Sequence, residues 1–187
     1  MFNLDKKLIE NSYKKIIDSL GDYVDHKGVQ DTPKRVANAY EELLSGYTAD
    51  IEKIINNALF DIEYDQIVIV KNIRFYSLCE HHILPFFGKI DIGYLPNQKV
   101  IGLSKIPRIT QAFSKRLQVQ ERLTEQIGKA IFENANALGA GVVINAQHMC
   151  SSMRGVNMPG TEMVTSSLFG TFKSDDATRK EFFDLIK

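Results

Sequence analysis

Both cysteines of the chain and three of its four histidines lie in two short clusters. The first cluster spans residues 79–82 (CEHH) and the second spans residues 147–150 (QHMC). Thiolate and imidazole side chains together bind borderline-soft metals such as zinc. A catalytic zinc site uses three protein ligands and leaves one position open. The two clusters therefore contain enough ligands for a catalytic metal site, with histidines left over for proton transfer.

The spacing of these residues indicates which of them would hold the metal. Cys79 and His82 are three residues apart, which on a turn brings a thiolate and an imidazole to one ion, and Cys150 is the candidate third ligand from the end of a distant strand. His81 would then point away from the metal. His148 and Cys150 would share one face of a strand, because residues i and i+2 do so. Zinc lowers the pKa of bound water toward about 7, and an imidazole, with its ordinary pKa of about 6.5, can carry the proton.

Other interpretations of the two clusters stay open. A single C-x-x-H is a weak signal, and buried free cysteines are common in protein cores. Two cysteines and three neighbouring histidines also suffice for a four-ligand structural zinc site. A disulfide between Cys79 and Cys150 is conceivable, although a reducing compartment disfavours it. The fourth histidine, His26, lies in a polar stretch and is expected to be a solvated loop residue.

Several cationic residues lie near predicted helix starts or near the second cluster. Exposed backbone N–H groups at a helix start favour anions, so cations gathered around a metal cavity would indicate a polyphosphate ligand. Each of them alone is more simply an exposed surface charge. Glu121 could accept hydrogen bonds from a guanine base, or it could serve only as a partner of the helix dipole. The candidate anion-binding residues are Ser104, Lys105, Arg108, Arg154 and Arg35.

The composition is that of an ordinary globular protein. The 187 residues are 44% hydrophobic and contain 23 basic and 23 acidic side chains, so the formal net charge is zero. This balance gives no support to nonspecific binding of nucleic acid or of a membrane. The first 20 residues contain no continuous apolar run typical of a secretion signal, and no stretch approaches a membrane span. We therefore expect a cytoplasmic protein with reduced thiols.

Hydrophobic periodicity predicts an α+β fold. The order is helices, then ββααββ, then a final helix, which indicates an antiparallel sheet with two packed helices. Thr32 is expected to cap the second helix, with Pro33 in its first turn. Residues 139–141 (GAG) are expected to break the helix before them. Helices are predicted over 4–20, 33–44, 50–58, from 104, over 119–136 and over 176–186, and strands over 66–78, 89–95, 142–150 and 162–172.

The pattern also divides the chain into two parts. Residues 1–64 are expected to form a helical extension, and residues 65–187 the catalytic domain. A four-stranded sheet covered on one face leaves two open edges, and pairing between subunits would satisfy them. We therefore expect an oligomer.

Several motifs in order along the chain closely resemble GTP cyclohydrolase I. The resemblance runs from about residue 29 to the carboxyl terminus, whereas residues 1–28 match only as a generic helix. Several separate motifs agree, and this agreement makes the resemblance specific. The motifs are residues 31–37 (DTPKRVA), 75–82 (FYSLCEHH), 100–106 (VIGLSKI), 117–124 (LQVQERLT), 148–150 (HMC) and 153–156 (MRGV).

The resemblance implies a tunnelling fold whose sheets join between subunits into a barrel ring. Five subunits would form a ring and two rings a homodecamer, with sites at subunit interfaces. Zinc would be held by Cys79, His82 and Cys150, and the proton-transfer residues would be His81 and His148. These assignments are what the resemblance implies.

The implied reaction converts GTP and water into formate and 7,8-dihydroneopterin triphosphate, the first step of pterin and tetrahydrofolate biosynthesis. His148 would protonate N7 of the purine, and His81 with Ser104 would assist opening of the ribose. Glu121 and the Gln120 backbone would anchor the guanine. The triphosphate and ribose would be surrounded by Ser104, Lys105, Arg108, Arg154 and Arg35, some of them from a neighbouring subunit.

Small departures from the family pattern leave the proposed ligands untouched. Ser151 and Ser152 stand where many relatives carry bulkier residues, and Asn145 and Gln147 replace common acidic residues. These changes bear on the surroundings of His148. Two alternatives remain: a catalytically inactive nucleotide-binding homologue with a structural zinc, and another tunnelling-fold pterin enzyme.

Overall fold

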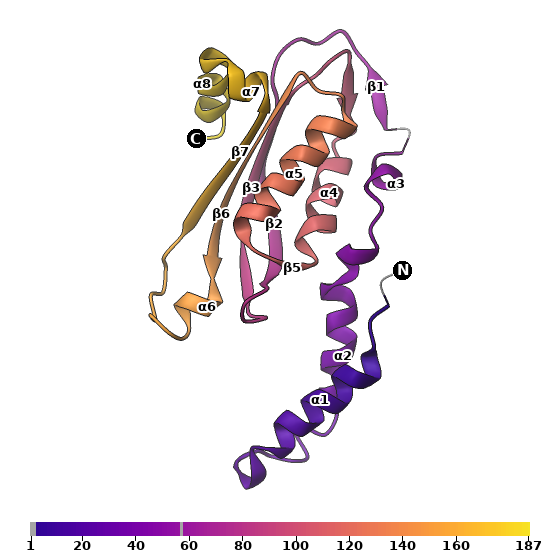
Figure 1. Ribbon diagram of the computed structural model, residues 1–187, viewed down its shortest axis with the longest axis vertical. Helices are drawn as coiled ribbons and strands as arrows, with labels where there is room; N and C mark the ends of the chain where they lie inside the picture. Colours follow the sequence, from indigo (N-terminus) through magenta and orange to yellow (C-terminus); the bar gives the residue numbers. More distant parts are fainter. Residues whose placement is uncertain (1–2, 57) are drawn as a thin grey trace.

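The computed structural model describes residues 3–56 and 58–187. Its elements form a helical hairpin, a sheet with two long helices on one face, and a short helical end (Figure 1). The helices are α1 (Lys6–Asp18), η1 (Gly21–Tyr23), α2 (Thr32–Leu43), η2 (Ser45–Thr48), α3 (Ile51–Ile55), α4 (Lys105–Ser114), α5 (Gln120–Asn134), α6 (Met149–Ser152), α7 (Thr171–Ser174) and α8 (Asp176–Leu185). The strands are β1 (Leu59–Asp61), β2 (Val68–Cys79), β3 (Pro85–Leu95), β4 (Lys99–Ile101), β5 (Leu117–Gln118), β6 (Gly139–His148) and β7 (Met163–Gly170).

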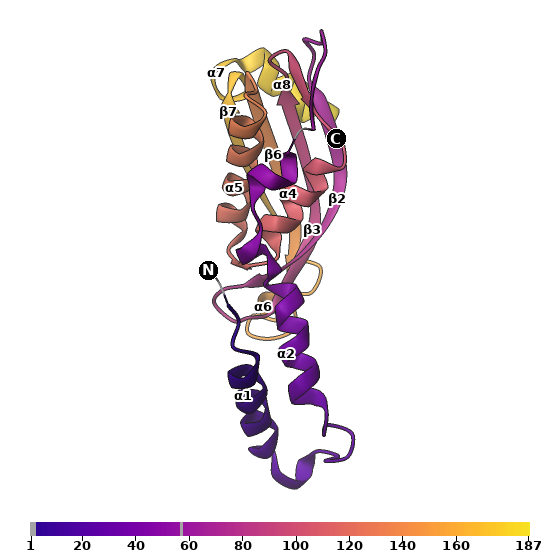
Figure 2. The same ribbon diagram turned by 90° about the vertical axis from the view of Figure 1, so that its right-hand side faces the viewer.

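Helices α1 and α2 form a hairpin that extends beyond the end of the sheet, as the side view shows (Figure 2). Asp5 caps α1 by accepting a hydrogen bond from the Leu8 amide at 2.8 Å. The predicted cap of α2 is wrong by one residue: Asp31 is the N-cap, and Thr32 is already helical. In the described parts of the chain, no helix has the length and apolar character needed to cross a membrane.

The main sheet has the strand order β5-β2-β3-β6-β7. Every neighbouring pair is antiparallel except β2 and the two-residue β5, which are parallel. A second ribbon pairs β1 with β4. The predicted α+β class with a mostly antiparallel sheet is therefore confirmed. The sequence pattern missed β1, β4 and β5 because two or three residues are too few to show alternation.

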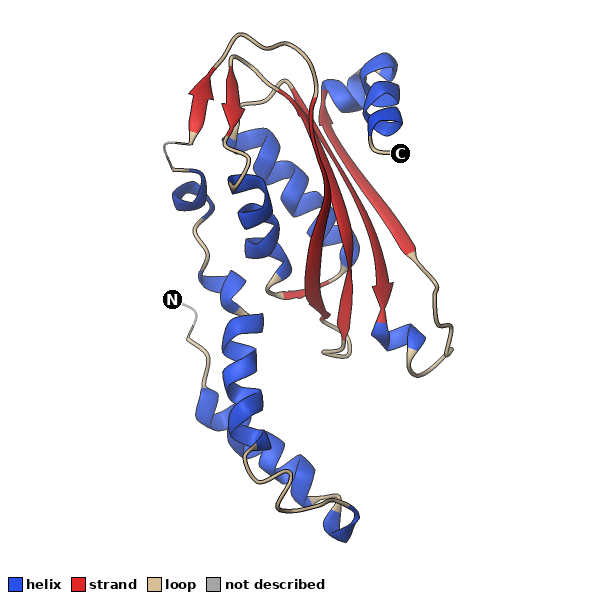
Figure 3. Cartoon of the chain, turned by 180° about the vertical axis from the view of Figure 1, so that it is seen from behind, coloured by secondary structure: helices blue, strands red, loops and turns tan. Residues whose placement is uncertain are grey.

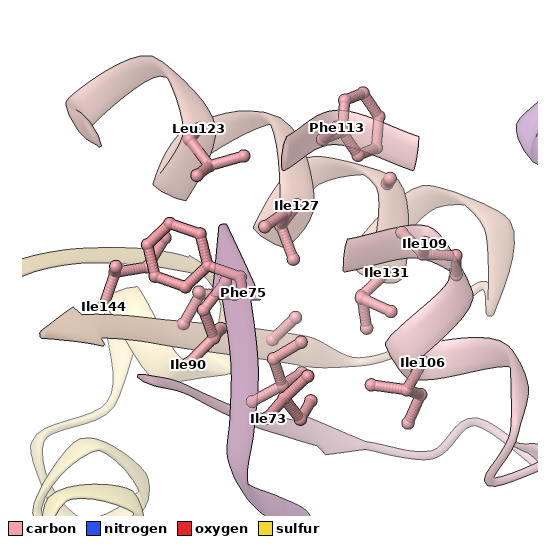
Figure 4. Packing of buried hydrophobic residues seen from close by; sticks show 14 of the residues in the cluster. Ile73, Phe75, Ile90, Ile106, Ile109, Phe113, Leu123, Ile127, Ile131 and Ile144 are labelled. Atoms are coloured by element: carbon pink, nitrogen blue, oxygen red, sulfur yellow. The ribbon is translucent and has the colours of Figure 1, made fainter. Parts of the chain in front are cut away.

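The main core lies between the sheet and the helix pair α4 and α5 (Figure 4). On α5, Leu123, Ile127 and Ile131 recur at intervals of four residues and are fully buried, which is the stripe of an amphipathic helix. They face Ile90 and Ile144 on the central strands, which are also fully buried. The central strands and α5 thus form a well-packed core, and β2 and β6 both end at the same end of this core.

A smaller core lies against the opposite face of the sheet, near the carboxyl terminus. Phe172 of α7 and Phe182 of α8 are fully buried there, with ring centroids 5.2 Å apart. Seen from behind, α8 lies at one end of the sheet and leaves the rest of this face uncovered (Figure 3). Accordingly Tyr76 on β2 and Val164 on β7 are exposed.

Several boundaries differ from the prediction, and β3 begins at Pro85, four residues before the strand predicted over 89–95. The helix predicted over 50–58 ends at Ile55, and residue 57 lies outside the described residues. The glycines at 139–141 belong to β6 and do not precede it. The strand predicted over 142–150 ends at His148, and Cys150 lies in α6. Gly141 fits a strand here because a side chain would meet the Phe172 and Phe182 rings, so the close packing of α7 and α8 requires glycine.

Substituting Gly88 with alanine tests the packing of the central strands. A Cβ at Gly88 would lie 1.9 Å from the Asn145 carbonyl oxygen, a backbone atom of the adjacent strand, so β3 and β6 would have to separate. We expect Gly88→Ala to lower the free energy of unfolding by about 3 kcal/mol or more, measured by urea denaturation.

Gly102→Ala is the matched control, because its nearest neighbour is the tip of the Phe60 side chain at 3.3 Å. We expect a loss below about 1 kcal/mol for this variant. Equal losses in the two variants would contradict the close approach of β3 and β6.

Candidate functional site

A tight turn between β2 and β3 positions the first cluster. The Cys79 carbonyl accepts hydrogen bonds from the His82 amide at 3.3 Å and the Ile83 amide at 2.8 Å, and the Cys79 amide donates to the Leu84 carbonyl at 2.8 Å. The Glu80 amide donates to the Gln118 carbonyl at 3.0 Å, which extends the pairing of β2 with β5. The backbone therefore fixes both Cys79 and His82 at the end of the sheet.

The second cluster reaches the same place through the sheet register. Phe86 of β3 pairs with His148 of β6, so the end of β6 lies beside the start of β3. The short helix α6 then brings Cys150 to the turn. The candidate ligand atoms of Cys79, His82 and Cys150 all lie within 4.8 Å of one another. Two thiols and an imidazole at this separation are a donor set that could hold a borderline-soft metal with one position open.

The turn contains a strained backbone. Ile83 has φ = 55°, in the left-handed region that β-branched residues rarely adopt. Its side chain is 45% exposed, so little packing compensates for the strain. Backbone strain of this kind occurs where the surrounding structure imposes it, often at functional sites.

The environment of Cys150 favours the neutral thiol. Burial, followed by the nearby Cys79 thiol, raises the pKa of Cys150, and the Arg154 guanidinium acts in the opposite direction. Arg154 also lies beside the cluster, with its Nη1 3.4 Å from His82 Nε2. A bound dication would therefore have to displace the proton of the Cys150 thiol.

His81 does not point away from the cluster as predicted. Its Nδ1 lies 3.8 Å from the Cys79 sulfur, and its ring lies edge-on to the ring of His82 with centroids 6.3 Å apart. The ligand atoms that group together are nevertheless those of Cys79, His82 and Cys150.

His148 is held on two sides at the end of β6. Its Nε2 lies 2.8 Å from Gln120 Oε1, and its ring stacks on Phe86 with centroids 4.7 Å apart and planes 7° apart. Burial lowers the pKa of His148, and the charge of Glu121 opposes this shift. The prediction that His148 and Cys150 share a strand face is wrong, because the strand ends between them.

The first turn of α5 lies next to both clusters. Arg122 forms an ion pair with Glu80 of the turn, which joins α5 to the first cluster. Glu121 is exposed and lines a hollow of about 460 Å³ together with Glu125, residues 165–170 and Lys173. A carboxylate in such a hollow can accept hydrogen bonds from a ligand.

The remaining candidate residues lie elsewhere in the chain. Ser104, Lys105 and Arg108 lie at the start of α4, whereas the far end of α4 leads into β5 beside Cys79 (Figure 1). An α-helix of ten residues is about 15 Å long, so the first residue of α4 lies about this far from the end of the helix that leads into β5. Arg35 lies on the projecting hairpin, ion-paired with Asp31 at 3.6 Å. A single chain therefore brings Arg154 to the cluster but neither the start of α4 nor Arg35.

Sequence reasoning missed several residues around His148. Phe86 lies before the strand predicted over 89–95, and Thr165 is an ordinary residue of the strand predicted over 162–172; their contacts appear only once β3, β6 and β7 are in register. The ion pair of Glu80 with Arg122 joins residues 42 apart in sequence, and no local pattern marks it. The side chain of Gln120 was also overlooked, because only its backbone was expected to act.

The comparisons of the sequence with known proteins agree with one another. The family model for GTP cyclohydrolase I matches residues 9–187. GTP cyclohydrolase 1 from Campylobacter jejuni is 50% identical over 181 residues, covering 97% of this chain and 95% of that protein. GTP cyclohydrolase 1 from Leptospira biflexa is 51% identical over 179 residues, covering 96% and 98% of the two chains. The enzyme of the same name from Methylococcus capsulatus is 49% identical over 179 residues, covering 96% and 97%.

Among solved structures, the apo form of an archaeosine synthase QueF-Like matches 58% of this chain and 97% of its own. The TM-score is 0.49 and the sequence identity 15%, a likeness too low to decide the fold family.

Replacing Ile83 tests the strain in the turn. Asparagine tolerates the left-handed conformation better than isoleucine, a difference of about 1 kcal/mol. We expect Ile83→Asn to keep or slightly raise the free energy of unfolding, measured by urea denaturation of the metal-free protein. The neighbouring Leu84, which has an ordinary φ and is partly buried, is the control. Leu84→Asn should destabilise the protein, and a comparable loss in both variants would contradict the strain.

Proposed function

The chain belongs to the GTP cyclohydrolase I family, and on this premise we propose that it converts GTP and water into formate and 7,8-dihydroneopterin triphosphate. This is the first step of pterin and tetrahydrofolate biosynthesis. The observation that carries the proposal is the convergence of Cys79, His82 and Cys150 within 4.8 Å, beside a turn that also contains His81. Retention of both spare histidines supports a catalytic role over a structural one.

Zinc is the metal that fits the donor set. Cys79, His82 and Cys150 would hold the ion, with the fourth position left for water or substrate. When bound, zinc acts as a Lewis acid that activates water near neutral pH. The nearby Arg154 would favour the anionic thiolates that the ion requires, because its guanidinium is always charged.

The residues of the chain would then bind GTP and transfer protons. Glu121 and the Gln120 backbone would orient the guanine, which presents N–H donors to a carboxylate. His148 would transfer a proton at the purine ring during opening, and His81 with Ser104 would assist opening of the ribose. Lys105, Arg108, Arg154 and Arg35 would bind the triphosphate and ribose, since cations and helix starts attract phosphate.

A site assembled from two or more copies of the chain accounts for the distribution of these residues. The start of α4 lies at the opposite end of the helix from β5 and Cys79, so one bound nucleotide would contact the cluster of one copy and the α4 start of another. Open edges at β7 and β5 supply surfaces on which sheets could pair into a barrel ring. We place the chain in the tunnelling fold, with residues 1–64 as the extension, residues 65–187 as the catalytic domain, and a homodecamer of two pentamers as the assembly.

The products of GTP turnover test the proposed function directly. We expect the purified zinc-loaded protein to release one formate per GTP and to yield a pterin that fluoresces after oxidation. Formate without a pterin would contradict the ring closure. The absence of both products would support an inactive nucleotide-binding homologue.

Two substitutions separate the metal ligands from the proton-transfer residues. We expect Cys150→Ser to lose zinc, because a hydroxyl is a poor replacement for a thiolate. We expect His148→Ala to keep zinc and lose turnover. Zinc content measured by atomic absorption and turnover measured by formate release check both outcomes. Full zinc retention in Cys150→Ser would contradict the three-ligand set.

Mixed assemblies test whether one site uses two copies of the chain. A double variant, Lys105→Ala with Arg108→Ala, and the single variant Cys150→Ser should each be nearly inactive alone. Coexpressed in equal amounts, they should regain about a quarter of wild-type activity, because both halves of a site are intact in about one case in four. Activity no higher than that of the separate variants would show that each site forms within one chain.

A further inference from the structure

The side chain of Gln120 is buried, with 1% exposed, and its amide is engaged on both sides. Its Nε2 lies within hydrogen-bond distance of three acceptors that share its two amide protons: the Met163 carbonyl at 2.9 Å, the Ile144 carbonyl at 3.1 Å and Thr165 Oγ1 at 3.1 Å. Its Oε1 lies 2.8 Å from His148 Nε2. We propose that Gln120 is a positioning residue whose side chain holds the His148 imidazole in one orientation and in the tautomer with its proton on Nε2.

The two carbonyl groups determine the orientation of the amide. The Ile144 and Met163 carbonyl oxygens can only accept hydrogen bonds, so the NH₂ group of Gln120 must face them. The reversed amide would place its oxygen against two acceptors, and a buried contact of that kind is costly. The Gln120 oxygen therefore faces His148.

The hydroxyl groups of Thr124 and Thr165 can each donate a hydrogen bond to one partner only. Thr124 Oγ1 must donate to the backbone carbonyl of Gln120 at 2.7 Å, because a carbonyl only accepts. Its oxygen is then the acceptor in the 2.6 Å contact with Thr165, so the Thr165 hydroxyl donates there. Having used its proton, Thr165 can only accept from Gln120 Nε2. Each contact thus agrees with the same orientation of the amide.

The tautomer of His148 follows from this network. An imidazole nitrogen 2.8 Å from an amide oxygen must donate a hydrogen bond to it, because an amide oxygen carries no proton and can only accept. Nε2 therefore carries the proton and Nδ1 the lone pair in the neutral ring. The parallel stack on the fully buried Phe86 fixes the ring plane, so the hydrogen bond and the stack together leave one orientation.

The orientation and tautomer of His148 follow from the hydrogen bonds and the ring stack alone. Only the role of His148 in catalysis rests on the proposed function. A proton that His148 exchanges with a ligand would pass through Nδ1, while the Nε2–H bond to Gln120 persists throughout. The imidazole would then stay in place during proton transfer. The Gln120 side chain, fully enclosed by the network, has no position from which to contact substrate, which leaves its backbone for that purpose.

Solid-state ¹⁵N NMR of the full-length, zinc-loaded protein measures the tautomer without any substrate. The protein carries ¹⁵N-labelled histidine and is kept at about pH 8, above the ordinary histidine pKa of about 6.5. The His148 signals are identified by their loss in His148→Asn. We expect a protonated-nitrogen signal at Nε2 and a lone-pair signal at Nδ1. The reverse pattern, or averaged signals from two exchanging tautomers, would overturn the inference.

Two glutamine variants then test the positioning role. Gln120→Met should give averaged or reversed His148 signals. The matched control is Gln118→Met, because Gln118 is also buried but bonds Phe113 and Gln126 and makes no contact with His148 in the structure. We expect the wild-type His148 pattern in this control. Loss of the pattern in both variants would indicate general disruption and overturn a specific role for Gln120.

Steady-state kinetics separate positioning from a merely structural role. We expect Gln120→Met to lower kcat by about 10- to 100-fold, a typical effect of misplacing a reacting group, with the KM for GTP nearly unchanged. In the His148→Ala background the same substitution should have no further effect on the residual kcat. A further loss there would overturn action through His148. If Gln120→Met does not fold, the wild-type spectrum alone still decides the tautomer, and absence of products from wild-type protein would reject only the proposed function.

Discussion

The register of the central strands is the constraint on which the candidate site depends. Cys79 and Cys150 are far apart in sequence, and they meet because β2 pairs with β3 and β3 pairs with β6. The pairing of Phe86 with His148 places the end of β6 beside the turn that contains Cys79 and His82. A slip of one residue would turn every side chain of β6 to the other face of the sheet. The buried side chains of Ile90 and Ile144 prevent such a slip, so core packing and site geometry are specified together.

Burial of the site residues themselves sets the electrostatics of the site. It raises the pKa of Cys150 and lowers the pKa of His148, so the neutral form of each group is favoured. A neutral Cys150 thiol binds a dication only by releasing its proton, which couples metal binding to pH. Arg154 and Glu121 supply opposing charges at its rim. The described residues therefore contain a complete candidate metal centre at one end of the sheet, and the start of α4 lies toward the other end.

Much of this arrangement could be predicted from the sequence, and the rest depended on contacts between distant residues. The periodic stripe of α5 predicted a buried helix, and the Cys and His types predicted the group that converges. The end of β6 could not be predicted, because nothing local distinguishes a strand through Cys150 from a strand followed by α6. The orientation of His81 depends on an exposed turn, and the role of the Gln120 side chain depends on carbonyl groups of β6 and β7. Hydrophobic stripes along helices of three or more turns could therefore be predicted from the sequence. The geometry around His148 could not, because it depends on how the strands of the sheet pair.

X-ray absorption at the zinc edge of the purified protein tests the central claim most directly, because it counts the sulfur atoms bound to the metal. Coordination by Cys79, Cys150 and His82 predicts two sulfur atoms at about 2.3 Å, one imidazole nitrogen at about 2.0 Å and one further light atom. A first shell with one sulfur atom or none, or with two imidazoles, would contradict the division of the clusters into three ligands and two free histidines.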